Sequence, residues 1–189
     1  HIHRKVYMPT YGLFDEGRFF ACGDEIRAFD TRFGRVGMLI CEDFWHASPA
    51  YLLWLDGADL FLHHSASPGR GISSAEQLAS SVWVDHINQA YASLFTSFIL
   101  HTNRVGFEDG FNFWGGSAVF DPNGVVLKHG PYHEESLITV ELDLDQLYRC
   151  LLYTSDAADD LLCVDLGGRR IIKKKNNINK NPSSLSTYH

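Results

Sequence analysis

The sequence predicts an α/β fold with a mixed sheet, and three observations support this. Apolar runs such as Val36–Ile40 are typical of strands buried on both faces. Helical patterns alternate with these strands, as in layered α/β proteins. Asp121–Gly124 lies between two short apolar segments and indicates a hairpin, so part of the sheet is antiparallel.

The predicted strands are short and apolar, and glycine, proline or polar residues bound them. They are His3–Tyr7, Ile26–Asp30, Arg35–Ile40, Leu60–His64, Phe95–Thr102, Ser117–Phe120, Val125–Lys128 and Glu135–Leu142. A loop is predicted over residues 10–20, because Gly12 and Gly17 break any helical or strand periodicity.

Two helices are predicted between these strands. The first spans Ala50–Leu55, with Ser48 as its cap and Pro49 at its first position. The second runs from a cap at Ser74 to about Ala92 and has one apolar face.

The chain is organised around the strand that ends at Cys41. Two acids follow the cysteine, and the first helix begins soon after them. At such a strand–turn–helix junction a nucleophile projects above the sheet edge, and amide N–H groups can face an oxyanion. Taken alone, however, a strand cysteine is more typical of a buried core residue.

Further motifs accompany this cysteine in a fixed order. Lys5 ends the first predicted strand, and Glu16 lies in the loop after it. Downstream come Gly57-Ala-Asp59, Ser65-Ala-Ser-Pro68, Asn103-Arg-Val-Gly106 and Phe113-Trp-Gly-Gly-Ser117. From His1 to about Arg149, this ordered set resembles the nitrilase, or carbon–nitrogen hydrolase, superfamily.

The resemblance implies a nitrilase-like αββα sandwich with mixed sheets and a Glu–Lys–Cys triad. Cys41 matches the nucleophile, Lys5 the lysine, and Glu16 the second glutamate that holds substrate and lysine in place. By the same resemblance, the general-base glutamate belongs to a part of the domain upstream of His1. We also expect the full-length protein to form a homo-oligomer.

Amide hydrolysis needs an activated nucleophile, a proton carrier and a group that holds the oxyanion. Lys5 and the N-terminal end of the following helix would stabilise the Cys41 thiolate. Lys5 would also hold the oxyanion, beside the backbone N–H of Glu42. The side chains of Glu42 and Asp43 are otherwise typical of acids near a helix N-terminus.

Several other residues are candidates for the substrate pocket. Trp45, Phe113 and Trp114 could wall it, although core packing is at least as typical of aromatic side chains. Asn103 and Arg104 could reach either the substrate or a subunit interface.

We expect a thiol amidohydrolase that cleaves a non-peptide C–N bond of a small amide through an acyl-enzyme and releases ammonia or an amine. An alternative is the glutaminase domain of a glutamine-dependent NAD synthetase, which Leu13–Glu16 and Cys41–Trp45 resemble. Phe107–Trp114 is more similar to stand-alone amidohydrolases, which we therefore rank first. A non-catalytic scaffold of the same fold is an alternative from another class. The expected partner is a small-molecule amide, without a cofactor.

Charge and composition disfavour several other partners. Six of the 16 basic and four of the 23 acidic residues lie in 150–189, so residues 1–149 carry a net charge of −9, which argues against nucleic acid. No apolar run is long enough to span a membrane. The four cysteines lack zinc spacing and the density of a disulfide scaffold, which favours a reducing cytoplasm. His63 and His64 face opposite sides of a strand, which disfavours a shared metal.

Residues 150–189 differ in kind from the rest. Cys150–Asp159 and Val164–Ile172 together resemble the in-frame translation of a transposase adapter used in preparing short-read sequencing libraries, and Lys173–Lys175 resembles the run of A that follows it. We therefore expect residues 1–149 to be the C-terminal two-thirds of a carbon–nitrogen hydrolase domain. Residues 150–189 would be a non-native tail without a fold.

Overall fold

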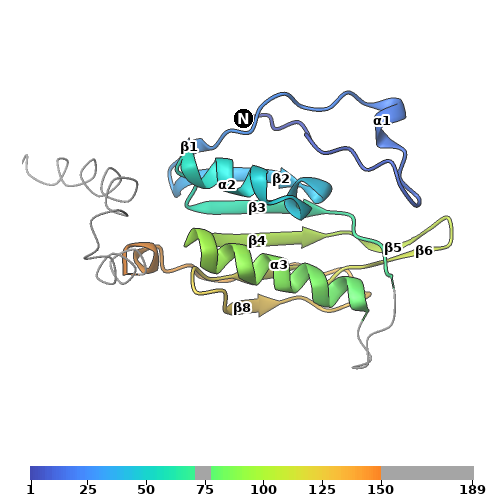
Figure 1. Ribbon diagram of the computed structural model, residues 1–189. Coiled ribbons are helices and arrows are strands. Elements are labelled where there is room, and N and C mark those ends of the chain that lie inside the picture. Colours follow the sequence, from blue (N-terminus) through green and yellow to red (C-terminus); the bar gives the residue numbers. More distant parts are fainter. Residues whose placement is uncertain (71–77, 150–189) are drawn as a thin grey trace, which may run out of the picture. The chain divides into compact units, whose positions relative to one another are not determined.

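The computed structural model describes residues 1–70 and 78–149. Its centre is a six-stranded sheet in the order β1-β2-β3-β4-β7-β8 (Figure 1). The strands are β1 (Phe29–Thr31), β2 (Gly34–Ile40), β3 (Leu60–Ser65), β4 (Phe98–Asn103), β7 (Ala118–Phe120) and β8 (Val126–His129). The three central strands β2, β3 and β4 are parallel, and the other neighbours pair antiparallel. The predicted α/β class with a mixed sheet is confirmed.

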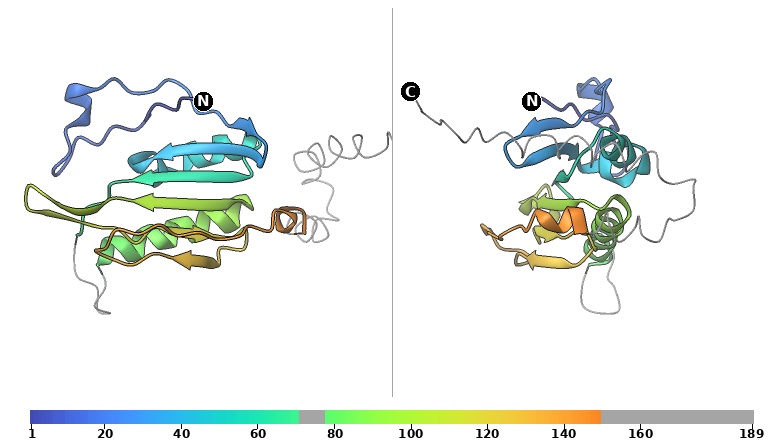
Figure 2. Two further views of the ribbon diagram at one scale, coloured as in Figure 1. Left: turned by 180° about the vertical axis from the view of Figure 1, so that it is seen from behind. Right: turned by 90° about the vertical axis from the view of Figure 1, so that its left-hand side faces the viewer.

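Helices α2 (Ala47–Leu55) and α3 (Ala79–Phe95) cover one face of this sheet, and the chain after β8 crosses the other face (Figure 2). Each helix links two parallel strands, which need a crossover connection. One helical layer on one mixed sheet is half of the αββα arrangement. In the described part of the chain, no helix is long and apolar enough to cross a membrane.

Alternation along the central strands divides the core in two. Residues on the helix side are Leu39, Phe61 and Ile99, which pack with Phe44, Leu53 and Phe95. Residues on the other side are Val36, Leu60 and Phe98, which pack with Leu142, Leu144 and Leu147. The strands are therefore buried on both faces, as their continuous apolar runs predict.

The predicted strand over His3–Tyr7 is wrong, since this segment has no regular structure. The N–H groups of Val6 and Tyr7 donate to the side chain of Asp43 instead of to a neighbouring strand. The loop predicted over residues 10–20 contains one helical turn, α1 (Glu16–Phe19).

The first long helix begins earlier than predicted. A 3₁₀ helix, η1 (Cys41–Trp45), fills the junction after β2, and α2 starts at Ala47 behind an extended His46. Ser48 and Pro49 therefore lie in the first turn of α2, and Ser48 does not cap it. Pro49 is still compatible with a first turn, where its missing N–H costs no hydrogen bond.

The second long helix begins later than predicted, at Ala79, because Leu78 is extended. The predicted cap, Ser74, lies outside the described residues. The helix ends at Phe95, and Thr96 adopts a left-handed φ of 47°. Strand β4 therefore starts at Phe98 rather than at the predicted Phe95.

Two hairpins complete the described fold. The turn at Asp121–Gly124 joins β7 and β8, as predicted. A second hairpin, β5 (Val105–Glu108) with β6 (Phe111–Trp114), was not predicted. Its signal was present in the sequence, because Asp109-Gly110 is a preferred pair for a tight turn, and both residues have positive φ.

The predicted last strand, Glu135–Leu142, is wrong because it pairs with no strand in the described part of the chain. The alternation of apolar and polar residues in this segment has another cause. Ile138 and Leu142 are half-buried while their neighbours are exposed, and Leu142 packs on the second face of the sheet. The adapter-like segment, residues 150–189, lies outside the described residues.

Candidate active site

Cys41 stands where β2 ends and η1 begins. Its φ of 47° is left-handed, a conformation that only three other non-glycine residues of the described chain adopt. Such a conformation costs a residue with a side chain of the order of 1 kcal/mol or more, and it is enriched at active sites. The predicted sharp turn at the candidate nucleophile is therefore present, and the thiol is half-buried.

Polar side chains from the next two strands gather beside this thiol. Ser65 Oγ, at the end of β3, lies 3.8 Å from Cys41 Sγ and 2.6 Å from Ser67 Oγ. Asn103, at the end of β4, accepts a hydrogen bond from the Ser67 backbone N–H at 2.9 Å. The carboxyl ends of parallel strands meet at one edge of the sheet, which is where α/β proteins bind ligands.

Lys5 and Glu16 form a close pair. The Lys5 ammonium donates to both carboxylate oxygens of Glu16, at 2.8 and 2.7 Å. The side chains are 11% and 25% exposed, so water screens the pair only partly. Two residues that the sequence placed in the same site are thus in contact, and Glu16 orients the lysine head.

Asp43 is completely buried and accepts four hydrogen bonds. Its donors are His3 Nε2 and the backbone N–H groups of Val6, Tyr7 and Ile40, at 2.8 to 3.2 Å. Burial alone would raise the pKa of this carboxyl, but the hydrogen bonds from His3 and the three amides outweigh it and lower the pKa. Sequence reasoning left Asp43 as a helix-end acid and missed these long-range partners.

Tyr11 and Glu42 form a second polar contact near the thiol. The Tyr11 hydroxyl donates to Glu42 Oε2 at 2.7 Å. Burial, and then the hydrogen bond to Glu42, raise the pKa of Tyr11 to about 12, and the charge of Cys41 acts in the same direction. The Arg70 guanidinium lies over the Tyr11 ring, 5.7 Å from its centroid. Neither Tyr11 nor Arg70 was singled out from the sequence.

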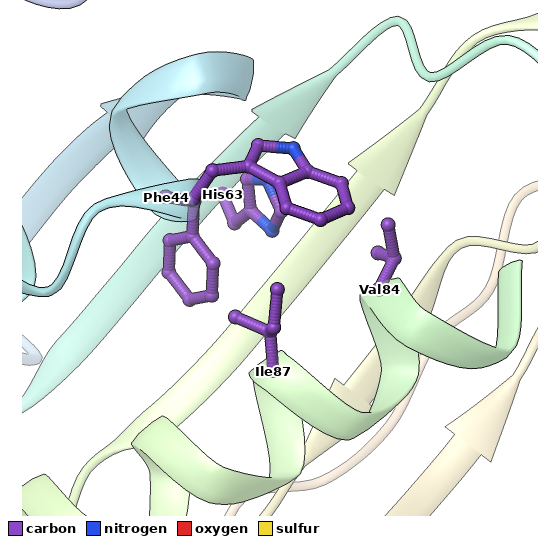
Figure 3. A pocket seen from close by; sticks show the side chains of 5 residues that line it. Phe44, His63, Val84 and Ile87 are labelled. Carbon is purple, nitrogen blue, oxygen red and sulfur yellow. The ribbon is translucent and has the colours of Figure 1, made fainter. Parts of the chain in front are cut away.

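Trp45 borders a hollow that the Cys41 thiol does not line. Phe44, Trp45, His63, Val84 and Ile87 line it, between η1, β3 and α3 (Figure 3). The hollow is partly open to solvent, its empty space is about 150 Å³ and it has no room for a water molecule. The structure therefore places Trp45 beside helix α3 rather than in a pocket around the thiol.

Two other predicted pocket residues have internal partners. Asn103 uses both ends of its amide, because its Oδ1 accepts from Ser67 and its Nδ2 donates to Gly115 O at 2.9 Å. Trp114 is completely buried, with its ring near His101. Asn103 thus braces the loop that carries the serines, and Trp114 is a core residue.

The sequence model of the family described as carbon-nitrogen hydrolase matches residues 1–150. The chain belongs to the carbon–nitrogen hydrolase family. The chain has the fold of a carbon-nitrogen hydrolase from Helicobacter pylori G27, with a TM-score of 0.74 over 89% of this chain and 60% of that one, at 23% sequence identity. The expected nitrilase-like fold is confirmed.

Curated relatives of this family member carry different activities in their names. A glutamine-dependent NAD(+) synthetase of Thermotoga maritima is 36% identical over 156 residues, which cover 80% of this chain and 25% of that protein. A probable nitrilase of Schizosaccharomyces pombe is 31% identical over 145 residues, which cover 76% of this chain and 48% of that protein. The chain thus spans a quarter of the first relative and about half of the second.

Proposed function

We propose that the hydrolase cleaves a non-peptide C–N bond of a small amide through a thioester on Cys41. The observation that carries this proposal is the left-handed turn that presents Cys41 at the carboxyl edge of the parallel strands. The Lys5–Glu16 pair supports it, because a partly buried ammonium is suited to stabilising negative charge. Membership of the carbon–nitrogen hydrolase family supports the reaction class.

In the proposed mechanism, the Cys41 thiolate attacks the amide carbon and the carbonyl oxygen becomes an oxyanion. Lys5 and the backbone N–H of Glu42 stabilise this oxyanion. The C–N bond then breaks, and the nitrogen takes a proton and leaves as ammonia or an amine. Water attacks the remaining thioester, which releases the acid and regenerates the thiol. These reaction steps require no cofactor.

The proton carrier is a separate question. Glu16 already accepts two hydrogen bonds from Lys5, and Glu42 accepts one from Tyr11. Asp43 accepts four hydrogen bonds, so each of the three carboxylates described at the site already has other partners. A general base must be free to take a proton. We assign the general base to a carboxylate outside the described residues.

The direct test replaces Cys41 by alanine in the full-length protein and measures ammonia release from simple amides. Turnover should fall to background while the urea unfolding midpoint changes little, because a half-buried thiol removes little volume. Cys22→Ala is the matched control, since Cys22 is an exposed free cysteine. Persistent turnover in the Cys41 variant would refute the nucleophile, and a wild-type protein without turnover would favour the scaffold alternative.

The second candidate is glutamine hydrolysis that supplies ammonia to a synthetase. Glu42 and Arg70 flank Tyr11 beside the nucleophile, and their opposite charges suit the α-ammonium and α-carboxylate of an amino-acid amide. The 36% identity to the Thermotoga maritima synthetase also favours it. A neutral small amide has no charged groups that could pair with Glu42 and Arg70.

Competing substrates decide between the two candidates. If glutamine is the substrate, its kcat/KM should exceed that of butyramide, and Glu42→Gln should raise the KM for glutamine alone. Glu108→Gln is the matched control, because Glu108 is an exposed acid paired with Arg104. Equal kcat/KM for the two amides would favour a stand-alone amidohydrolase.

A further inference from the structure

Asp43 links the segment that carries Lys5 to the turn that carries Cys41. Its Oδ1 accepts the N–H groups of Val6 at 2.9 Å and Tyr7 at 2.8 Å, the two residues directly after Lys5. Its Oδ2 accepts from His3, two residues before Lys5, and from the N–H of Ile40, directly before Cys41. One carboxylate thus holds the backbone directly after the lysine and the side chain of His3 before it.

These bonds are hard to replace. Asp43 is fully buried and the His3 side chain is 2% exposed, so this pair is shielded from water, and Val6 and Tyr7 are half-buried. Residues 1–10 belong to no helix or strand, and single backbone bonds such as that from Gly23 N–H to Lys5 O take the place of a strand ladder. Buried N–H groups without a partner are strongly disfavoured, so the segment must follow the carboxylate.

We infer that Asp43 is a positioning residue, which seats Lys5 for its role at the Cys41 oxyanion. This inference rests on the proposed function. Glu16 fixes the head of the lysine side chain, and Asp43 fixes the backbone from which that side chain extends. After four hydrogen bonds, the carboxylate oxygens of Asp43 have no lone pair left for a substrate, so Asp43 does not contact the substrate itself.

A double-mutant cycle in the full-length protein tests this coupling. Asp43→Ala should lower kcat by about 100-fold with little change in KM, because a displacement of about 1 Å in a catalytic group can have that effect. In a Lys5→Ala background, the same change should alter kcat by no more than about twofold, because the group that Asp43 positions is gone. Asp43→Asn keeps the Oδ1 acceptor for Val6 and Tyr7 and should lose less than Asp43→Ala.

Asp121 provides a matched control. It is 6% exposed, its Oδ1 accepts the N–H groups of Asn123 and Val125 at 2.9 and 2.8 Å, and its Oδ2 accepts from Gln146 at 2.6 Å. It follows β7, which runs antiparallel to β4, so it lies at the sheet edge opposite the thiol. Asp121→Ala should lower stability, and any effect on kcat should be the same with and without Lys5.

The outcomes are distinct. An equal fractional loss of kcat for Asp43→Ala in both backgrounds would overturn the inference and leave the proposed function standing. If Lys5→Ala alone has no effect on kcat, both the role of Lys5 and this inference fail. If Asp43→Ala does not fold, Asp43→Asn enters the same cycle, and the absence of coupling in that variant overturns the inference.

Discussion

The Lys5 ammonium lies 2.8 and 2.7 Å from the two carboxylate oxygens of Glu16, which makes the pair bidentate. It joins an irregular N-terminal segment to the one-turn helix α1, eleven residues further along. The side chains are mostly shielded from solvent, so the geometry of this pair controls where the positive charge lies.

The first prediction concerns this pair. Glu16→Gln should lower kcat/KM by about 10- to 100-fold, the equivalent of the ~1.5–3 kcal/mol typical of one hydrogen bond to a charged group. The glutamine has one acceptor oxygen, and its amide N–H₂ group would face the ammonium. Steady-state kinetics of amide hydrolysis measure the effect. Asp15→Asn is the control, because Asp15 is an exposed neighbour with only a 3.9 Å contact to Arg18, and an equal loss there would contradict the prediction.

The second prediction concerns backbone strain at Cys41. Glycine adopts a left-handed φ without the steric cost that alanine has, although it loses more entropy on folding. Cys41→Gly should therefore be more stable than Cys41→Ala by about 0.5–1 kcal/mol, with both variants inactive. Urea unfolding at equilibrium measures the difference. A more stable alanine variant would mean that the turn is not strained.

The third prediction is a loss of stability in mild acid. Burial, and secondarily the nearby His64, lower the pKa of His63 to about 4, and burial lowers the pKa of His101 well below its usual value. The unfolded chain, with ordinary histidine pKa values near ~6.5, then binds more protons than the folded one. The stabilisation is complete above pH ~6.5 and is lost as the pH falls from there toward 4.

As the pH falls through that window, the protonation of each of these two histidines should lower the free energy of unfolding by about 1.4 kcal/mol per pH unit. His129 acts in the opposite direction, because Asp85 raises its pKa, and it offsets part of the slope. Urea unfolding at pH 7 and pH 5 measures the net change. His63→Gln should flatten the slope, whereas His86→Gln, at an exposed position on α3, should not. Equal slopes in wild type and His63→Gln would contradict the prediction.

The fourth prediction concerns Gly23, whose N–H donates to Lys5 O at 2.7 Å. A Cβ at this position would lie 2.3 Å from the backbone oxygen of Arg4. Gly23→Ala must therefore push the Arg4–Lys5 backbone away, and kcat should fall even if the protein stays folded. Kinetics and circular dichroism together check this. Asp24→Ala, at the exposed neighbouring position, should leave both unchanged, and wild-type kcat in Gly23→Ala would refute the argument.

Local patterns were sufficient for several features of this protein. The apolar run to Ile40 and the break at Cys41 predicted the strand and the sharp turn, because a buried strand leaves a continuous apolar signal. Asp121–Gly124 predicted its hairpin, because turn residues act within four positions. The alternation that places His63 inside and His64 outside follows from the two-residue period of a strand.

Features that depend on distant partners needed the tertiary structure. His3–Tyr7 has a strand-like sequence, but its amides meet the side chain of Asp43 instead of a sheet. Glu135–Leu142 alternates like a strand, yet it covers the second face of the sheet without pairing. The sequence alone predicted which residues carry the chemistry. The structure decided which groups Asp43 contacts, because an acid three residues after a strand has the same local pattern whether it faces water or four donors. His3, Val6 and Tyr7 lie 36 to 40 residues away along the chain.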